Sequence, residues 1–239
     1  VAISNYVKNE IIKKYNLDSN KITVINRGVD VEYFDKKIPD HNIKSLISKF
    51  KINASKKIIL YPSRLTRWKG QLEFLDTFNK FQNSDFLLYF VGDTKNQSYT
   101  LKLQDKIHKL NLNNNCKILG NLNRDELKIF YHLSTVVVSF PIQAEGFGRT
   151  ISEALIMKKK IIAFNYGGVK DQLENLDDIY KVNSNDYGDI LIKLQKIIQL
   201  DKDQFLNISS FSRDRIIKSF SKSQMVKNYF NLYEQASIY

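Results

Sequence analysis

The sequence predicts an α/β fold built on a doubly wound parallel sheet, with additional helices at its C-terminal end. Short segments that are apolar on both faces and often β-branched alternate with longer amphipathic segments five or more times. Continuous apolar runs are typical of buried parallel strands, and the amphipathic segments between them are typical of crossover helices. The chain has 239 residues, 43% of them hydrophobic, with 15 Phe and 13 Tyr, which suffices for a sizeable core and excludes disorder as the main state.

Seven short apolar segments are predicted strands, and the last of them is the weakest by pattern. They are Lys21–Asn26, Lys57–Tyr61, Phe86–Val91, Cys116–Leu119, Thr135–Phe140, Lys160–Phe164 and Ile179–Val182. In doubly wound folds ligands bind at the carboxyl ends of such strands, so the segments that follow them are the candidates for a site.

The amphipathic segments between the strands are predicted helices, and three more follow the last strand. Asp201 and Ser221 have the side chains that favour helix N-caps. The predicted helices are Asn5–Tyr15, Ile43–Phe50, Gln71–Phe81, Tyr99–Leu110, Arg124–His132, Thr150–Met157, Asp186–Leu200, Asp203–Lys218 and Ser221–Gln235.

The net charge of +12 is concentrated in the first half of the chain. Residues 1–120 hold 21 Lys and Arg against 11 Asp and Glu, a net charge of +10, whereas residues 121–239 carry +2. Such asymmetry favours nucleic acid, an anionic membrane or a phosphate-bearing substrate as partner. A compositional bias that fills solvated faces explains it equally well, because Lys is far more frequent than Arg, and no nucleic-acid partner is expected.

Several classes of site are excluded by composition. One cysteine, Cys116, cannot form a disulfide scaffold, and it opens a strand as a core residue would. His41, His108 and His132 lie in separate segments without metal-ligand spacing, so no metal is expected. No apolar run approaches the ~18 residues that cross a bilayer, and no secretory signal is visible at the start.

The first candidate site follows the strand Lys57–Tyr61. Arg64 and Lys69 lie between this strand and the next helix, and Gly70 closes the segment. Two fixed cations beside a helix N-terminus favour an anion, and a phosphate or diphosphate fits them. Two solvated cations in a basic protein are the alternative.

The second candidate site, Ala144–Ala154, follows the strand Thr135–Phe140. Gly146 and Gly148 allow a ligand to approach backbone N–H groups, and Thr150 is the expected cap of the following helix. Two carboxylates, Glu145 and Glu153, suit the paired donors of sugar hydroxyls. The alternatives are a loop carboxylate for Glu145 and a capping box with Thr150 for Glu153.

A third, weaker segment is Asn165–Gly168, where paired glycines permit a backbone nest near an anion. A simple turn is the default interpretation. A dinucleotide-binding fingerprint is absent from the sequence, because no G-x-G-x-x-G follows the first strand.

Together these segments resemble the donor-binding half of a retaining nucleotide-sugar glycosyltransferase of the GT-B architecture, in the large family-four group. The resemblance extends over the whole chain. The motif sequences are similar to those of bacterial members that build lipopolysaccharide or other surface glycans. It is carried by the Ser4–Tyr15 helix, the Lys21–Asp30 "V-I-x-x-G-V-D" turn, the Ser63–Gly70 "G-R-L-x-x-x-K-G" segment, the Glu145–Glu153 E-x7-E motif and the closing Phe211–Glu234 helices.

The resemblance implies a Rossmann-like donor domain and a role for each matching residue. Arg64 and Lys69 would hold the donor diphosphate and stabilise the leaving group, and Glu145 would bind hydroxyls of the transferred sugar. Glu153 would bind the ribose. The remaining donor contacts implied are Gly146, Phe147, Gly148, Arg149 and Thr150 near phosphate or sugar, Asn121 and Leu122 beside the base, and Gly92 in a nearby loop.

Three departures from the family pattern stand out. Ser63 replaces the usual glycine before the arginine, and Lys158 replaces the glycine that ends a helix, which predicts a strained turn of about 1 kcal/mol. The acceptor-binding N-terminal domain of a full enzyme is missing. Residues 1–20 are interpreted as its remnant and hinge, residues 21–200 as the nucleotide-sugar-binding domain, and residues 201–239 as helices packed on it.

The expected function is metal-free transfer of a hexose-type sugar, with retention, from a nucleotide-diphosphate sugar to a glycan or glycolipid acceptor in cell-envelope glycan synthesis. The expected location is the cytoplasm, with peripheral contact to the inner membrane left open. One alternative is a non-catalytic donor-binding half, or a truncated remnant, whose acceptor domain is a separate chain. A nucleotide-sugar epimerase is a lesser alternative.

Overall fold

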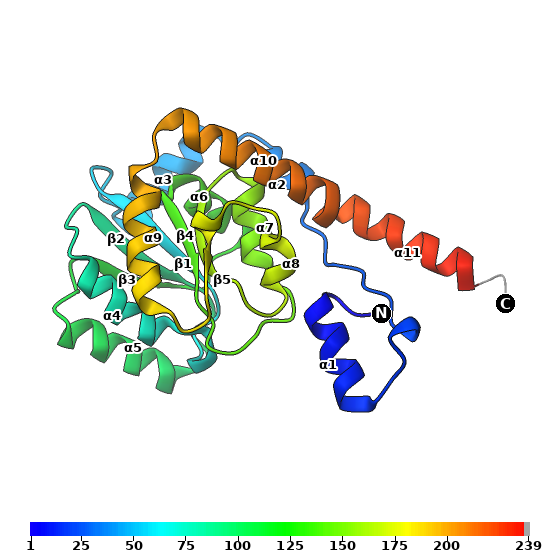
Figure 1. The fold of residues 1–239 in the computed structure, drawn as a ribbon. Coiled ribbons are helices and arrows are strands. Elements are labelled where there is room, and N and C mark those ends of the chain that lie inside the picture. The colour runs from blue at the N-terminus through cyan, green and yellow to red at the C-terminus, as the bar shows by residue number, and fades with distance from the viewer. Residues whose placement is uncertain (237–239) are drawn as a thin grey trace.

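A parallel six-stranded sheet forms the centre of residues 1–236, the part of the chain that the computed structural model describes (Figure 1). The strand order is β3-β2-β1-β4-β5-β6, and every neighbouring pair is parallel. This Rossmann-like, doubly wound order confirms the predicted fold class. The strands are β1 (Lys57–Pro62), β2 (Phe86–Val91), β3 (Cys116–Gly120), β4 (Val136–Ser139), β5 (Lys160–Phe164) and β6 (Lys181–Val182).

Helices cover both faces of the sheet. Helix α4 packs beside α5 and α9, α3 packs on α6, and α10 lies along α7. The α-helices are α1 (Asn5–Tyr15), α2 (Val31–Asp35), α3 (Asp40–Phe50), α4 (Gln71–Phe81), α5 (Gln97–Lys109), α6 (Arg124–Leu133), α7 (Arg149–Ile156), α8 (Val169–Leu173), α9 (Tyr187–Gln199), α10 (Lys202–Phe220) and α11 (Lys222–Ala236).

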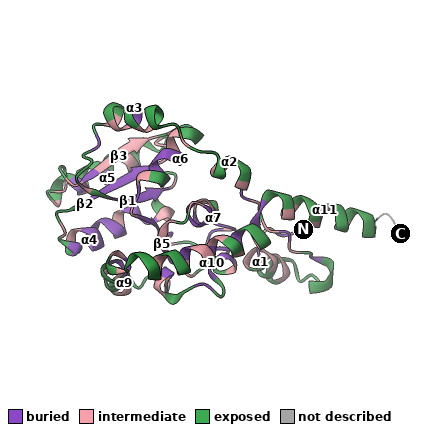
Figure 2. Cartoon of the chain, turned by 90° about the horizontal axis from the view of Figure 1, so that it is seen from above, coloured by how far each residue is buried: buried purple, intermediate pink, exposed green. Residues whose placement is uncertain are grey.

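The sheet lies between these layers and is the most buried part of the molecule (Figure 2). All six residues of β2 are buried, as its continuous apolar sequence predicts. Aromatic rings fill the centre: the ring of Tyr61 lies 5.6 Å from that of Phe74 and 6.2 Å from that of Phe140. This packing makes the ends of β1 and β4 a rigid base for the loops that follow them.

The predicted strand Lys21–Asn26 is wrong. Lys21 ends a 3₁₀ turn that begins at Ser19, and the only bridge in the segment joins Val24 to the single residue Ala2. The chain turns into α1 at Asn5 and leaves too few residues for a ladder. The predicted strand Ile179–Val182 is half right, because a 3₁₀ turn occupies Asp178–Tyr180 and only the last two residues pair with β5.

The predicted N-cap residues are confirmed for α10 and α11 but are wrong for α7. Asp201 accepts a hydrogen bond from the N–H of Gln204, and Ser221 caps α11 in the same way. Thr150 does not cap α7, because the helix begins one residue earlier with Gly148 at the N-cap. At the other end of α7, Lys158 has a φ of 52°, which confirms the predicted left-handed turn at a residue that disfavours it.

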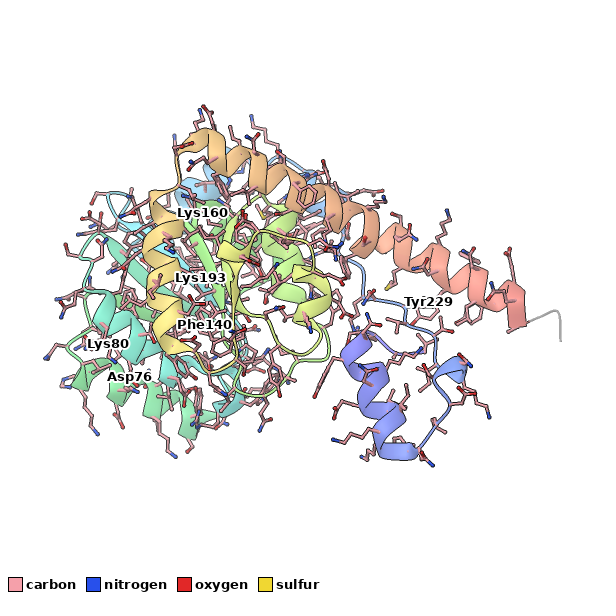
Figure 3. All side chains as sticks on the ribbon, in the orientation of Figure 1. Asp76, Lys80, Phe140, Lys160, Lys193 and Tyr229 are labelled. Carbon is pink, nitrogen blue, oxygen red and sulfur yellow. The ribbon has the colours of Figure 1, made fainter. Side chains whose placement is uncertain are left out.

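Two segments lie away from the sheet: the N-terminal arm that carries α1, and α11 (Figures 1 and 3). Neither helix has a buried residue, and α11 exposes Val226 and Phe230. Figure 3 places Tyr229 of α11 far from Phe140, the residue that directly follows β4. Among residues 1–236, no helix has the length and apolar character needed to cross a bilayer.

Candidate functional site

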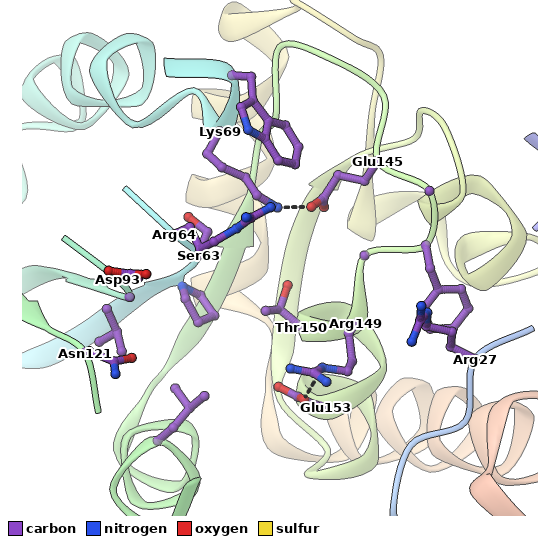
Figure 4. Close-up of a pocket in the computed structure, with 18 of the residues that line it drawn as sticks. Arg27, Ser63, Arg64, Lys69, Asp93, Asn121, Glu145, Arg149, Thr150 and Glu153 are labelled. Atoms are coloured by element: carbon purple, nitrogen blue, oxygen red, sulfur yellow. Dashed lines mark hydrogen bonds and ion pairs between the residues drawn. The ribbon is translucent and has the colours of Figure 1, made fainter. Parts of the chain in front are cut away.

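The sheet reverses its order between β1 and β4, and a cavity opens at the carboxyl ends of these strands. Chain connections leave in opposite directions at such a switch point, so a crevice forms between the loops and is the usual ligand site of the fold. The cavity has a volume of about 490 Å³. Figure 4 shows side chains from loops far apart in sequence meeting there.

All twelve residues that the sequence predicts for the site line this one cavity. Loops after β1, β2, β3 and β4 and the N-terminal part of α7 contribute them. They are Arg64, Lys69, Gly92, Asn121, Leu122, Glu145, Gly146, Phe147, Gly148, Arg149, Thr150 and Glu153.

The loop after β1 supplies two cations close together. Lys69 contacts the indole of Trp68, with its ammonium 4.3 Å from the ring centre, and Arg64 lies 5.9 Å from the same ring. Burial, and secondly the Arg64 guanidinium, lower the pKa of Lys69 to about 8. Among the described residues no carboxylate pairs with Arg64. The loop therefore presents positive charge that the residues described by the structure do not fully compensate.

Backbone contacts fix this loop against the end of β4. The buried phenol of Tyr61 donates to the carbonyl of Lys69, 2.5 Å away, and accepts from the N–H of Phe140 at 2.9 Å. The N–H of Ile142 donates to the carbonyl of Trp68 at 2.9 Å. Lys69 is thereby held in register with the loop that carries the carboxylate opposite.

Glu145, in the loop after β4, is that carboxylate. The Lys69 ammonium donates to its Oε1, across 76 residues of sequence. The other oxygen, Oε2, is buried and has no hydrogen-bond partner among the described residues. A buried carboxylate oxygen without a donor is costly, so a hydroxyl entering the cavity would satisfy it.

The glycine loop between Glu145 and α7 is held from behind. Gln172 of α8, fully buried, donates to the carbonyls of Phe147 and Gly148 and accepts from Ser152. The N–H of Gly168 donates to the carbonyl of Glu145 at 2.7 Å. The Asn165–Gly168 segment thus supports the loop as a turn and does not line the cavity, so the nest interpretation is wrong.

Glu153 points into the cavity from α7 with both oxygens engaged. Its Oε2 accepts from the buried Tyr131 phenol at 2.8 Å, and its Oε1 lies 3.2 Å from the Nε of Arg149. The capping-box alternative is therefore wrong, because Thr150 is inside the helix. Burial raises the pKa of Glu153, and the Tyr131 hydrogen bond and nearby arginines oppose that shift.

Other lining residues escaped the sequence analysis. Arg27 and Ile3 come from the N-terminal arm, and Asp93 follows Gly92 after β2. Ile3 and Arg27 lie just outside the predicted helix Asn5–Tyr15 and the predicted strand Lys21–Asn26, so no predicted element places them at the cavity. Asp93 could have been predicted from the sequence, because it lies two residues after the predicted strand Phe86–Val91. The further lining residues are Pro62, Ser63, Trp68, Val91 and Leu127.

Cys116 and the three histidines take no part in the cavity. Cys116 is buried in β3, and burial raises the pKa of its thiol far above the usual range. It is a core residue, as the sequence predicts.

The fold and the site define a doubly wound α/β protein whose switch-point cavity brings fixed cations beside carboxylates. Residues 42–213 match the family model described as glycosyl transferases group 1. This match covers more than half of the chain, and the chain therefore belongs to that family.

Similar proteins of known structure share the whole fold. A glycosyltransferase from Rickettsia africae superposes with a TM-score of 0.91 at 32% identity, over 98% of this chain and 62% of that one. The Anabaena protein HepE, solved with UDP and glucose, gives a TM-score of 0.85 at 22% identity, over 100% of this chain and 62% of that one.

Curated relatives are longer than this chain. A capsular polysaccharide biosynthesis glycosyltransferase of Staphylococcus aureus is 27% identical over 237 residues, covering 95% of this chain and 58% of the relative. A trehalose synthase of Pyrococcus horikoshii is 23% identical over 225 residues, 90% of this chain and 53% of the relative. The chain thus spans a little over half the length of these relatives.

Proposed function

We propose that this chain is the donor-binding part of a glycosyltransferase that uses a nucleoside-diphosphate sugar. The observation that carries the proposal is the meeting of Arg64 and Lys69 with Glu145 and Glu153 around one cavity at the switch point. Cations suit a diphosphate, and carboxylates suit sugar and ribose hydroxyls.

The chemistry follows from where the charges lie. When the bond between the sugar and the diphosphate breaks, negative charge develops on the departing phosphate. Lys69 and Arg64, fixed by the β1 and β4 loops, would stabilise that charge in the transition state without rearranging. Lys69 would then share its ammonium between the phosphate and Glu145.

Glu145 would hold the transferred sugar. Its buried Oε2 lacks a donor among the described residues, and a sugar hydroxyl would supply one. Glu153 would accept hydrogen bonds from the ribose. The chain's own cations are sufficient for the diphosphate in this scheme, so we propose that no metal is needed.

The finer parts of the proposal rest on the resemblance and on relatives. Retention of configuration and a hexose-type sugar come from the E-x7-E resemblance. A place in cell-envelope glycan synthesis is supported by the capsular relative and by a Salmonella typhimurium lipopolysaccharide 1,2-N-acetylglucosaminetransferase, 22% identical over 231 residues. We propose cytoplasmic action, with the basic first half at the inner membrane surface.

We further propose that the acceptor site needs protein beyond the described residues. The relatives extend past the part that matches, and α1 and α11 project from the sheet without a buried residue. In that case this chain binds donor by itself and transfers sugar only with the acceptor-binding part. Turnover of labelled donor by this chain alone would contradict this division of labour.

Calorimetry with UDP and GDP, in buffer containing EDTA, tests the central proposal. We expect one of the two to bind at least about one hundredfold more tightly than its nucleoside, because the diphosphate contacts two cations. If each nucleoside diphosphate binds no more tightly than its nucleoside, the proposal is overturned. Binding lost in EDTA and restored by Mg²⁺ would overturn only its metal-free part.

Diphosphate affinity should also depend on alkaline pH. The pKa of Lys69 is lowered to about 8, so the free protein loses this ammonium as the pH rises through that value. A bound diphosphate restores the charge, so binding takes up a proton above pH ~8 and affinity falls by up to about tenfold per pH unit. Calorimetry in buffers of different ionisation enthalpy measures the uptake. The Lys69→Arg variant, charged throughout, should show neither effect.

A further inference from the structure

Tyr131 lies beneath the cavity without lining it. The residue is fully buried on α6, and its phenol donates to Glu153 Oε2 at 2.8 Å. Helix α6 follows β3 and α7 follows β4, so this hydrogen bond joins two separate crossover units. No local sequence signal links the two residues.

The two oxygens of Glu153 differ in their surroundings. Oε2 is held from the protein interior by Tyr131, whereas Oε1 lies 3.2 Å from Arg149, whose side chain is 72% exposed. The Glu153 side chain is itself 13% exposed and lines the cavity. Oε1 is therefore the oxygen that a ligand reaches. The ligand would either displace the exposed Arg149 guanidinium or bind beside it.

We propose that Tyr131 is a positioning residue that aims Glu153 Oε1 at the ribose hydroxyls of the donor. The inference rests on the proposed function and goes beyond it, because Tyr131 itself touches no ligand. The terminal torsion of a glutamate is broad, so a carboxylate without an anchor samples several orientations. The phenol fixes one of them before the donor arrives, which spares the ordering cost on binding.

The same hydrogen bond favours the ionised form of Glu153. Its carboxylate faces Arg149 on its own helix, Tyr131 and Arg124 on α6, and Tyr33 on α2. Burial favours the neutral acid, and the Tyr131 phenol and the two arginines favour the carboxylate. Loss of the phenol hydroxyl would raise the pKa of Glu153, and a neutral acid is a weaker hydrogen-bond acceptor for ribose.

The experiment compares Tyr131→Phe with a matched variant, Tyr89→Phe. Tyr89 is 1% exposed in β2 and packs on Phe130, the neighbour of Tyr131, but its phenol oxygen has no partner among the described residues. Both changes remove one buried hydroxyl and keep the ring. The probes are UDP and GDP, each beside its 2′,3′-dideoxy counterpart, and calorimetry gives the affinity ratio within each pair.

We expect the wild type and Tyr89→Phe to prefer the ribose form by at least about tenfold, the lower end of what a hydrogen bond to an ionised group contributes. In Tyr131→Phe the ratio should fall to about threefold or less, and in Glu153→Gln the added Tyr131→Phe change should have no further effect. The midpoint at which UDP affinity is lost on acidification should move to higher pH in Tyr131→Phe but not in Tyr89→Phe.

Four outcomes overturn the inference. An unchanged ratio in Tyr131→Phe would show that Glu153 needs no anchor. An equal loss of affinity for both members of a pair would show a purely structural role. A wild type that binds the nucleoside diphosphate without preferring the ribose form would remove the ribose contact while leaving the diphosphate proposal intact, whereas a wild type that binds no diphosphate overturns both.

Discussion

Replacement of Lys69 by alanine should lower the affinity for the nucleoside diphosphate by at least about one hundredfold. The change removes a cation at the diphosphate, and a hydrogen bond to a charged group contributes about 1.5–3 kcal/mol. It also leaves Glu145, a buried carboxylate, without its cation and facing an anionic ligand. Together these effects amount to about 3 kcal/mol or more, which calorimetry resolves easily.

A matched control separates the site from general charge. Lys106, whose ammonium lies 2.6 Å from a carboxylate oxygen of Asp76 on the neighbouring helix, does not line the cavity, so Lys106→Ala should bind the diphosphate normally. The double variant Lys69→Ala with Glu145→Ala should recover part of the loss, because the repulsive carboxylate is gone. Equal diphosphate affinity in Lys69→Ala and the wild type would reject the role of Lys69.

Replacement of Gly70 by alanine should destabilise the whole chain and close the site. Gly70 has a φ of 76°, and an added Cβ would lie 2.0 Å from the carbonyl oxygen of Phe140. The loop after β1 and the end of β4 would have to separate, which would break the register that Tyr61 maintains between Lys69 and Phe140. The left-handed conformation costs an alanine about 1–2 kcal/mol, and overpacking costs about 1–3 kcal/mol. Together these losses in the free energy of unfolding should lower Tm by about 10 °C.

Gly120 offers the control for that experiment. Its φ of 75° is nearly the same, but nothing lies within 4 Å of an added Cβ. Gly120→Ala therefore carries the backbone strain without the collision and should lower Tm by only about 2–8 °C. If calorimetric melting shows equal decreases in Tm for the two variants, the close approach of Gly70 to Phe140 does not contribute to stability.

The strands and most helices could be predicted because their signals are local. Phe86–Val91 and Lys160–Phe164 are strands with the predicted bounds, and Gln71–Phe81 is a helix with the predicted bounds. Burial on both faces requires continuous apolar sequence, which is visible without neighbours. Lys21–Asn26 is rich in β-branched residues but lacks a neighbouring strand, and composition alone cannot supply one.

The candidate site was predictable to the level of loops. Residues after strand ends in a parallel sheet share one edge, so Arg64, Lys69 and Glu145 could be expected around one crevice. The residues that hold the site from behind could not be predicted in this way. Gln172 and Tyr131 lie in helices, look like ordinary core positions and act through hydrogen bonds that cross more than 20 residues of sequence.

The chain's local sequence determines a parallel α/β sheet and which loops carry cations, glycines and carboxylates, because periodicity and turn chemistry depend on near neighbours. Only the tertiary structure decides that β1 lies beside β4, that Lys69 donates to Glu145, and that Tyr131 anchors Glu153. Those pairings depend on strand order and on packing between helices of separate crossover units. Their energies come from contacts between distant residues, which leave no pattern in any short stretch of the chain.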